Sequence, residues 1–255
     1  MILTTSAKSG YKTAIFAKRL AEHLKIQYFP RKSDKMPKDS MLVINSSMEI
    51  RLLKENKKDF FFHPSISKIR IKNAEQGYDY LLKALDLKDG DTVFDCTFGL
   101  GSEAILISYY NPSGRIIGSE KSREIFTVVY NGLRTYIDKS EKITEAIRRI
   151  ELRFGDYKNI LSQYKNIDKI YIDPMFKKPI FKSSSINAFR DLASYDYADK
   201  NDLEYLKKIA RDRVVVKIRI KDGILSEDLF DKIVKSSKSD IMYGILFTKN
   251  ENSNS

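Results

Sequence analysis

Residues 93–104 read V-F-D-C-T-F-G-L-G-S-E-A, and this stretch decides the fold class. A short apolar run ends at Asp95 and gives way to a turn in which Gly99, Gly101 and Ala104 match the pattern G-x-G-x-x-[GA]. Between a strand and a helix, such glycines let the backbone turn sharply and approach a bound nucleotide. The stretch therefore predicts the nucleotide-binding turn of an α/β fold.

Strand-like and helix-like segments alternate around this turn. The pattern predicts strands at 92–95, 115–120, 150–156, 169–174 and 213–219, and helices at 76–85, 102–109, 122–137, 157–164 and 202–210. This alternation is typical of a doubly wound, mostly parallel sheet with helices on both faces. Residues 231–248 contain two more strand-like runs, which fit an antiparallel end to the sheet.

The N-terminal part of the chain has a different pattern. It contains a helical stretch at 11–24 and strand-like runs at 41–45 and 60–64. We expect a small α/β unit over residues 1–74 and the main domain over residues 75–255.

Composition limits the chemistry. The chain has 255 residues, a net charge of +12, one cysteine (Cys96) and two histidines (His23 and His63). An internal disulfide and a cysteine-based zinc site are excluded, a histidine-dependent metal site or catalytic triad is disfavoured, and we expect no metal. The charge suits a polyanionic partner, although a lysine-rich solvated surface gives the same balance. The sequence shows neither a signal peptide nor a membrane-spanning stretch, which predicts a cytoplasmic protein without a membrane partner.

Four expected strands in succession end at or next to a carboxylate. These residues are Asp95, Glu120, Asp156 and, within the motif D-P-M-F at 173–176, Asp173. Ligands of open parallel sheets bind at the carboxyl ends of the strands. The four acids are therefore expected to line one site.

Asp95 bears on the choice of cofactor. A carboxylate just before the glycine turn would repel the pyrophosphate of a dinucleotide, whereas the ammonium and sulfonium cations of S-adenosylmethionine would be attracted. Glu120 can accept hydrogen bonds from both hydroxyls of a ribose. Asp156 can accept one from an adenine amino group, or can instead cap the following helix. These residues favour S-adenosylmethionine over NAD.

The motif D-P-M-F gives the clearest indication of the reaction. An exocyclic amino group of a nucleobase is a poor nucleophile, because its lone pair is delocalised into the ring. The Asp173 carboxylate and the Pro174 carbonyl can accept its N–H groups and localise the lone pair. Phe176 can stack on an unstacked base. An ordinary Asx-Pro turn at the end of a strand is the alternative interpretation.

Basic side chains around the motif are candidates for contact with nucleic-acid phosphates, or for a solvated loop. They are Lys177, Lys178, Lys182 and Arg190. Lys217 and Arg219 also project toward this edge, where pairing with the carboxylates is the alternative. In the N-terminal unit, Lys32, Lys35 and Lys38 are expected to help hold RNA.

The motifs D-C-T-F-G-L-G, S-E-K, Y-I-D-P-M-F and R-V-V-V-K resemble those of class I S-adenosylmethionine-dependent methyltransferases. More narrowly, they are similar to the RsmJ-type family, which methylates the exocyclic N2 of a guanine in 16S ribosomal RNA. The likeness runs through most of residues 75–220. The pair after G-L-G departs from it, being Arg-Asp in the family and Ser-Glu here.

The resemblance implies a Rossmann-like fold, S-adenosylmethionine as methyl donor with S-adenosylhomocysteine as product, and RNA or the small ribosomal subunit as partner. The combined cofactor set is Asp95, Thr97, Gly99, Gly101, Ser102, Glu103, Glu120, Lys121, Gly155, Asp156 and Asp173. The catalytic set is Asp173, Pro174, Met175 and Phe176.

We predict an RNA N-methyltransferase that modifies a guanine N2 in small-subunit ribosomal RNA. The alternatives are an N6-adenine methyltransferase on DNA or RNA, an NAD-dependent oxidoreductase, and a non-catalytic RNA-binding protein with the same fold.

Overall fold

Two β-sheets organise the computed structural model, which describes residues 1–31, 40–54, 59–174, 199–219, 227–236 and 239–248. Parallel pairs join the first three strands of the N-terminal sheet, and antiparallel pairs join the rest. In spatial order, this sheet consists of β2 (Gln27–Tyr28), β1 (Ile2–Thr5), β3 (Ser40–Ile44), β4 (Ile50–Lys54) and β5 (Phe60–Phe61).

The larger sheet carries the glycine turn. In spatial order, its strands are β11 (Lys232–Lys235), β12 (Ile241–Phe247), β10 (Arg213–Arg219), β9 (Lys169–Ile172), β6 (Thr92–Asp95), β7 (Arg115–Glu120) and β8 (Glu151–Phe154). The five strands from β10 to β8 pair in parallel, and β12 pairs antiparallel with both β10 and β11. The prediction of a mostly parallel sheet with an antiparallel end is confirmed.

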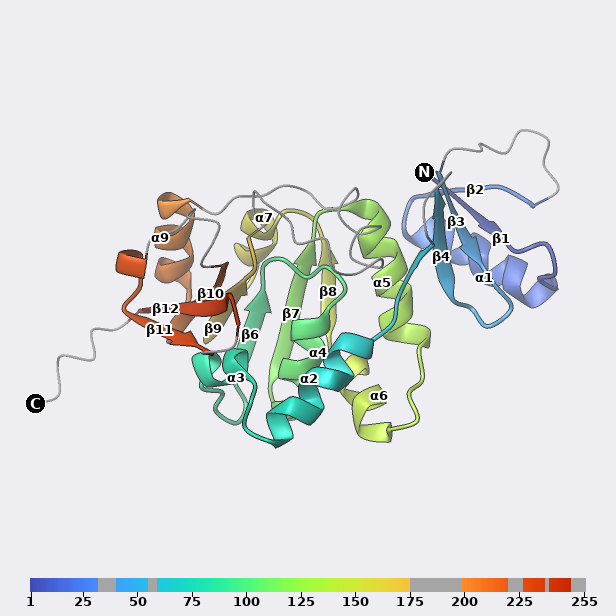
Figure 1. Cartoon of the computed structure of the whole chain (residues 1–255). Helices are drawn as coiled ribbons and strands as arrows, with labels where there is room; N and C mark the ends of the chain where they lie inside the picture. The colour runs from blue at the N-terminus through green and yellow to red at the C-terminus, as the bar shows by residue number, and fades with distance from the viewer. Residues whose placement is uncertain (32–39, 55–58, 175–198, 220–226, 237–238, 249–255) are drawn as a thin grey trace, which may run out of the picture.

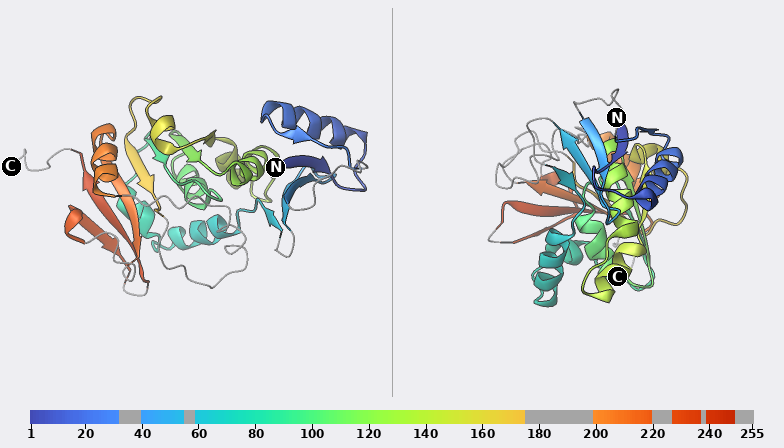
Figure 2. Two further views of the ribbon diagram at one scale, coloured as in Figure 1. Left: turned by 90° about the horizontal axis from the view of Figure 1, so that it is seen from above. Right: turned by 90° about the vertical axis from the view of Figure 1, so that its right-hand side faces the viewer.

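Helices cover both faces of the larger sheet (Figures 1 and 2). They are α2 (Ser65–Glu75), α3 (Tyr80–Leu85), α4 (Ser102–Tyr110), α5 (Arg123–Thr135), α6 (Glu141–Arg148), α7 (Tyr157–Leu161) and α9 (Lys200–Ile209), with a short 3₁₀ turn, η1 (Glu227–Leu229). Successive strand residues serve opposite faces: Val93 joins the core under α3, α4 and α5, and Phe94 joins the core under α7 and α9. This alternation explains the continuously apolar strands.

The N-terminal sheet packs against α5, beyond the edge of the larger sheet (Figure 1). Asn131 on α5 donates its side-chain N–H to the Met48 carbonyl oxygen at 2.8 Å. A Cβ at Gly132 would lie only 2.2 Å from Cγ of Phe62, so a glycine lets this ring lie directly against α5. Helix α1 (Tyr11–His23) lies against β1 and β2.

Several elements differ from the expected pattern. Strands β1, β2 and β4 and helices α2 and α6 were not predicted. The expected helix 76–85 is shorter, because Gly77 adopts a left-handed φ of 78° and Asp79 caps α3 by accepting the Leu82 N–H. Helix α2, which belongs to the expected N-terminal unit, packs on α4. Along the described ranges, no helix combines the length and apolarity needed to cross a bilayer.

Candidate functional site

The glycine turn after β6 wraps around the ring of Phe98. Gly99 and Gly101 adopt left-handed φ angles of 55° and 74°, and Phe98 is 2% exposed. A Cβ at Gly101 would lie 2.6 Å from Cε1 of Phe98, closer than atoms pack. Both the left-handed backbone conformation and the close approach of Phe98 therefore require glycine at position 101, where the turn leads into α4.

Glu120, at the end of β7, is tied to this turn. Its Oε2 accepts the Gly99 N–H at 3.0 Å, and its Oε1 accepts the Ser122 N–H at 2.7 Å. The residue is buried. Glu120 therefore holds the glycine turn from the end of β7.

Thr97 links the first and fourth strand ends. Its backbone N–H donates to Oδ1 of Asp95 at 3.0 Å, and its hydroxyl oxygen accepts the Asp173 N–H at 2.7 Å. Burial raises the pKa of Asp95 well above its ordinary value, and the negative charge of Glu103 acts in the same direction. The site thus contains a buried acid that a nearby cation would help to ionise.

A chain of ion pairs runs from α2 to Asp173. Lys217 Nζ on β10 lies 2.6 Å from Oδ2 of Asp173 and 3.6 Å from Oε1 of Glu103. The same Glu103 oxygen lies 2.9 Å from Nη1 of Arg70, whose Nε and Nη2 donate to both oxygens of Asp79. Burial opposes ionisation of Glu103, but Lys217 and Arg70 outweigh it and hold the pKa of this carboxylate below its ordinary value.

The third strand end is held by a more exposed pair. Lys121 Nζ lies 3.2 Å from Oδ2 of Asp156, and Asp156 Oδ1 accepts the Lys158 N–H as the cap of α7. Gly155 adopts a φ of 142°. The alternative interpretation of Asp156 as a helix cap is thus observed.

The structure brings the predicted strand-end acids to one edge of the larger sheet. Lys217 pairs with carboxylates there, which is the second of the two roles considered for it, the first being contact with phosphates. Pro174 is buried, and Ser102 begins α4. Sequence reasoning missed Arg70, which precedes the expected domain, and Ser122, whose side chain caps α5. The candidates that lie outside the described residues are Lys32, Lys35, Lys38, Met175, Phe176, Lys177, Lys178, Lys182 and Arg190.

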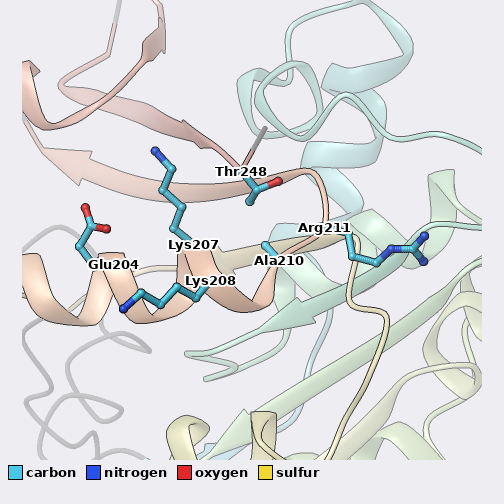
Figure 3. A pocket seen from close by; sticks show the side chains of 6 residues that line it. All are labelled: Glu204, Lys207, Lys208, Ala210, Arg211 and Thr248. Atoms are coloured by element: carbon cyan, nitrogen blue, oxygen red, sulfur yellow. The ribbon is translucent and has the colours of Figure 1, made fainter. Parts of the chain in front are cut away.

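A separate hollow of about 500 Å³ lies near the C-terminal end of α9 (Figure 3). Ala210 and Arg211, just before β10, form part of its wall, so it lies at the edge opposite the strand-end acids. Its other lining residues are Glu204, Lys207, Lys208 and Thr248. It includes no residue of the glycine turn.

Comparisons with known proteins show what the chain is similar to. Residues 20–242 match the family model SAM_MT, described as "Putative SAM-dependent methyltransferase". The chain is 31% identical to "Uncharacterized protein YpiP" of Bacillus subtilis (strain 168), over 97% of this chain and 99% of that protein. It is 32% identical to "Ribosomal RNA small subunit methyltransferase J" of Buchnera aphidicola subsp. Schizaphis graminum, over 66% of this chain and 69% of that protein.

A solved structure shares the fold. The S-adenosylmethionine-dependent methyltransferase NGO1261 of Neisseria gonorrhoeae aligns with a TM-score of 0.70 at 16% identity. The alignment covers 97% of this chain and 96% of that one, so it includes both sheets.

Proposed function

Because this chain belongs to the S-adenosylmethionine-dependent methyltransferase family, we propose that it methylates a nucleobase amino group in RNA, specifically a guanine N2 of small-subunit ribosomal RNA. The observation that carries the proposal is the position of Asp173. Its backbone N–H donates to the Thr97 hydroxyl oxygen at 2.7 Å, which ties Asp173, our proposed amine acceptor, to the glycine turn. The 32% identity to a ribosomal RNA small subunit methyltransferase supports the choice of substrate.

The residues present fit the cofactor. S-adenosylmethionine supplies an electrophilic methyl group on a sulfonium, and it carries an ammonium but no phosphate. The carboxylates of Asp95, Glu103 and Asp173 influence one another electrostatically at this edge and would favour such cations. We assign Glu120 to the ribose hydroxyls, because its carboxylate is already oriented by the turn.

Asp173 would hold the substrate amine. Its carboxylate and the Pro174 carbonyl would accept the two N–H groups, so that the nitrogen lone pair points at the methyl carbon. Transfer of the methyl group that the sulfonium would supply would leave positive charge on the amine nitrogen, which the Asp173 carboxylate would stabilise. The amine then loses one proton to solvent. Positioning provides much of the catalysis in such a displacement.

The experiment that tests the substrate is a map of methylated bases. Ribosomal RNA from a strain lacking the gene is compared with RNA from the parent strain, and is then incubated with the purified protein and S-adenosylmethionine. We expect one N2-methylguanosine to be absent in the deletion strain and restored in vitro. Restoration of N6-methyladenosine instead would contradict the base, and no change in any RNA base would contradict the substrate class.

Glu120→Gln tests the cofactor assignment. Glutamine keeps the shape, but it replaces one acceptor oxygen by an amide that cannot accept the backbone N–H. Hydrogen bonds to a charged group contribute about 1.5–3 kcal/mol, so we expect the Kd for S-adenosylmethionine to rise about 10- to 100-fold. Calorimetry measures this directly. An unchanged Kd would show that Glu120 does not hold the cofactor.

Substitutions on helix α1 test whether this helix contributes to RNA binding. Lys12, Lys18 and Arg19 are exposed on its outer face, and electrostatic attraction to phosphates should contribute to binding there. Replacing all three by glutamine should weaken RNA binding and reduce the slope of log K against log salt by about 2. The control variant replaces Lys200, Lys207 and Lys208 of α9 by glutamine, which removes the same charge. An equal loss in both variants would contradict a specific role for α1.

A further inference from the structure

We propose that Lys217 is a positioning residue for Asp173, and that Arg70 supports it by fixing Glu103, the second carboxylate beside the Lys217 ammonium group. The inference rests on the proposed function, because it takes Asp173 as the acceptor of the substrate amine. It assigns a role to Lys217 and to Arg70, and Arg70 lies before the expected main domain.

The contacts leave Lys217 little freedom. Its ammonium lies 2.6 Å from Asp173 and 3.6 Å from Glu103, and its side chain is 17% exposed. A lysine held between two carboxylates fixes the direction of both. Because it lies at Oδ2 of Asp173, it directs the carboxylate so that Oδ1 is the oxygen better placed for another donor.

Arg70 keeps this arrangement in place. Its guanidinium bonds both oxygens of Asp79 at 2.9 and 3.1 Å, and its Nη1 donates to Oε1 of Glu103 at 2.9 Å. The planar guanidinium suits this two-sided geometry, which a lysine could not reproduce. Glu103 is therefore anchored from α2 and cannot turn away from Lys217 without breaking a partly buried ion pair.

The same contacts bear on phosphate binding by Lys217. A phosphate would have to replace both carboxylates at a largely buried ammonium group. Buried ion pairs are costly to break, because each partner left behind is an uncompensated charge. Positioning of Asp173 therefore fits the geometry better than contact with the RNA backbone.

Charged groups from several elements act on Asp173. Burial raises its pKa above the ordinary value, and Glu103 on α4 acts in the same direction. Lys217 and Arg219, both on β10, favour the ionised form. Asp95 on β6 and the buried Tyr171 on β9 also interact electrostatically with Asp173. Since Lys217 is the nearest cation to Asp173 among the described residues, its removal should leave Asp173 protonated over a wider pH range.

Lys217→Met and Lys217→Arg test the proposal through the pH profile of kcat for RNA methylation. An opposite charge within about 4–6 Å shifts a carboxyl pKa by about 1–3 units. We therefore expect the acidic limb of the profile to move upward by about 1–3 pH units in Lys217→Met. Lys217→Arg should keep the limb near its wild-type position. A merely structural role would lower the melting temperature without moving the limb.

Controls separate the possible failures. Lys208→Met makes the same exchange at the hollow on α9 and should leave the profile unchanged. Arg70→Lys should show part of the Lys217→Met shift. If Lys217→Met keeps the wild-type limb while Asp173→Ala is inactive, the positioning role is wrong and the proposed function stands. If Asp173→Ala retains methylation, the proposed role of Asp173 fails instead. Should Lys217→Met fail to fold, Lys217→Gln and Arg70→Lys provide the same measurement.

Discussion

Replacing Asp173 by alanine should lower the rate of RNA methylation by about 10²- to 10³-fold, the range typical for removing one preorganised group that stabilises charge in the transition state. The variant loses the carboxylate that would accept the amine N–H and stabilise the positive charge developing on nitrogen. Its backbone N–H can still donate to Thr97, so the glycine turn should keep its shape. Single-turnover kinetics with saturating RNA measure the effect on the chemical step.

Binding of S-adenosylmethionine by Asp173→Ala should remain measurable by calorimetry. Glu120 and the glycine turn are unchanged in this variant, and they hold most of the contacts that we assign to the cofactor. Asp173→Asn is the matched control, because it keeps an acceptor oxygen but removes the charge. We expect its rate to lie between those of wild type and alanine. Full methylation by Asp173→Ala would refute the catalytic assignment.

The larger fold could be predicted because its strands are apolar on both faces. Val93 and Phe94 contribute to opposite cores, which is why the segment reads as continuous and not alternating. The strand-end acids could be predicted to meet for a related reason. The carboxyl ends of parallel strands lie at one edge of the sheet whatever the exact register. That Asp95, Glu120 and Asp173 lie at the same edge could therefore be predicted without knowledge of tertiary contacts.

The ion-pair chain could not be predicted in the same way. Arg70 lies on α2, where Ile66 and Ile69 are exposed while Ser67 is buried, so hydrophobicity does not mark the inner face of this helix. Nothing in the spacing of Arg70 and Glu103 indicates that their side chains meet, because the contact depends on α2 packing against α4. Tertiary packing decides such pairs.

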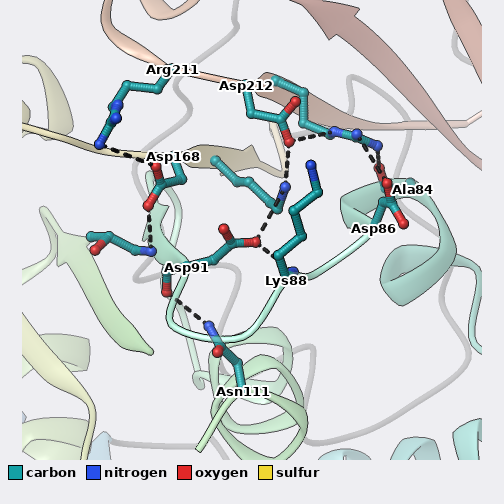
Figure 4. A network of polar contacts seen from close by, with 11 residues as sticks. Ala84, Asp86, Lys88, Asp91, Asn111, Asp168, Arg211 and Asp212 are labelled. Atoms are coloured by element: carbon teal, nitrogen blue, oxygen red, sulfur yellow. Dashed lines mark hydrogen bonds and ion pairs between the residues drawn. The ribbon is translucent and has the colours of Figure 1, made fainter. Parts of the chain in front are cut away.

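Lys169 is a second case that sequence obscures. A lysine at the first position of a strand usually lies in solvent, yet Lys169 is 0% exposed. Its ammonium contacts Asp212 and lies 3.2 Å from Oδ2 of Asp91. Figure 4 shows the polar network to which Asp91 and Asp212 belong. Both acids lie just before the strands that flank β9, namely β10 and β6, so the N-terminal edge of the sheet gathers charges as the opposite edge does. Arg213 extends the network by pairing with Asp212 and Asp86.

Lys169→Ala should lower the free energy of unfolding by about 3–5 kcal/mol, because it leaves the largely buried Asp91 without its cation and Asp212 with Arg213 alone. Arg211→Ala is the matched control. Arg211 is 61% exposed and lies 3.6 Å from Asp168, so its loss should cost less than about 1 kcal/mol. Urea unfolding at pH 7, followed by far-ultraviolet circular dichroism, measures both.

The pH dependence of this loss identifies its cause. Although burial favours protonation of Asp212, the hydrogen bond and charge of Lys169 hold its pKa below the ordinary value. The stability that this depressed pKa provides is present above the pKa of the unfolded chain and is lost as pH falls through that of the folded protein. The difference between wild type and Lys169→Ala should therefore narrow below about pH 4. A constant difference across this range would point to lost packing of the lysine side chain, because packing does not titrate.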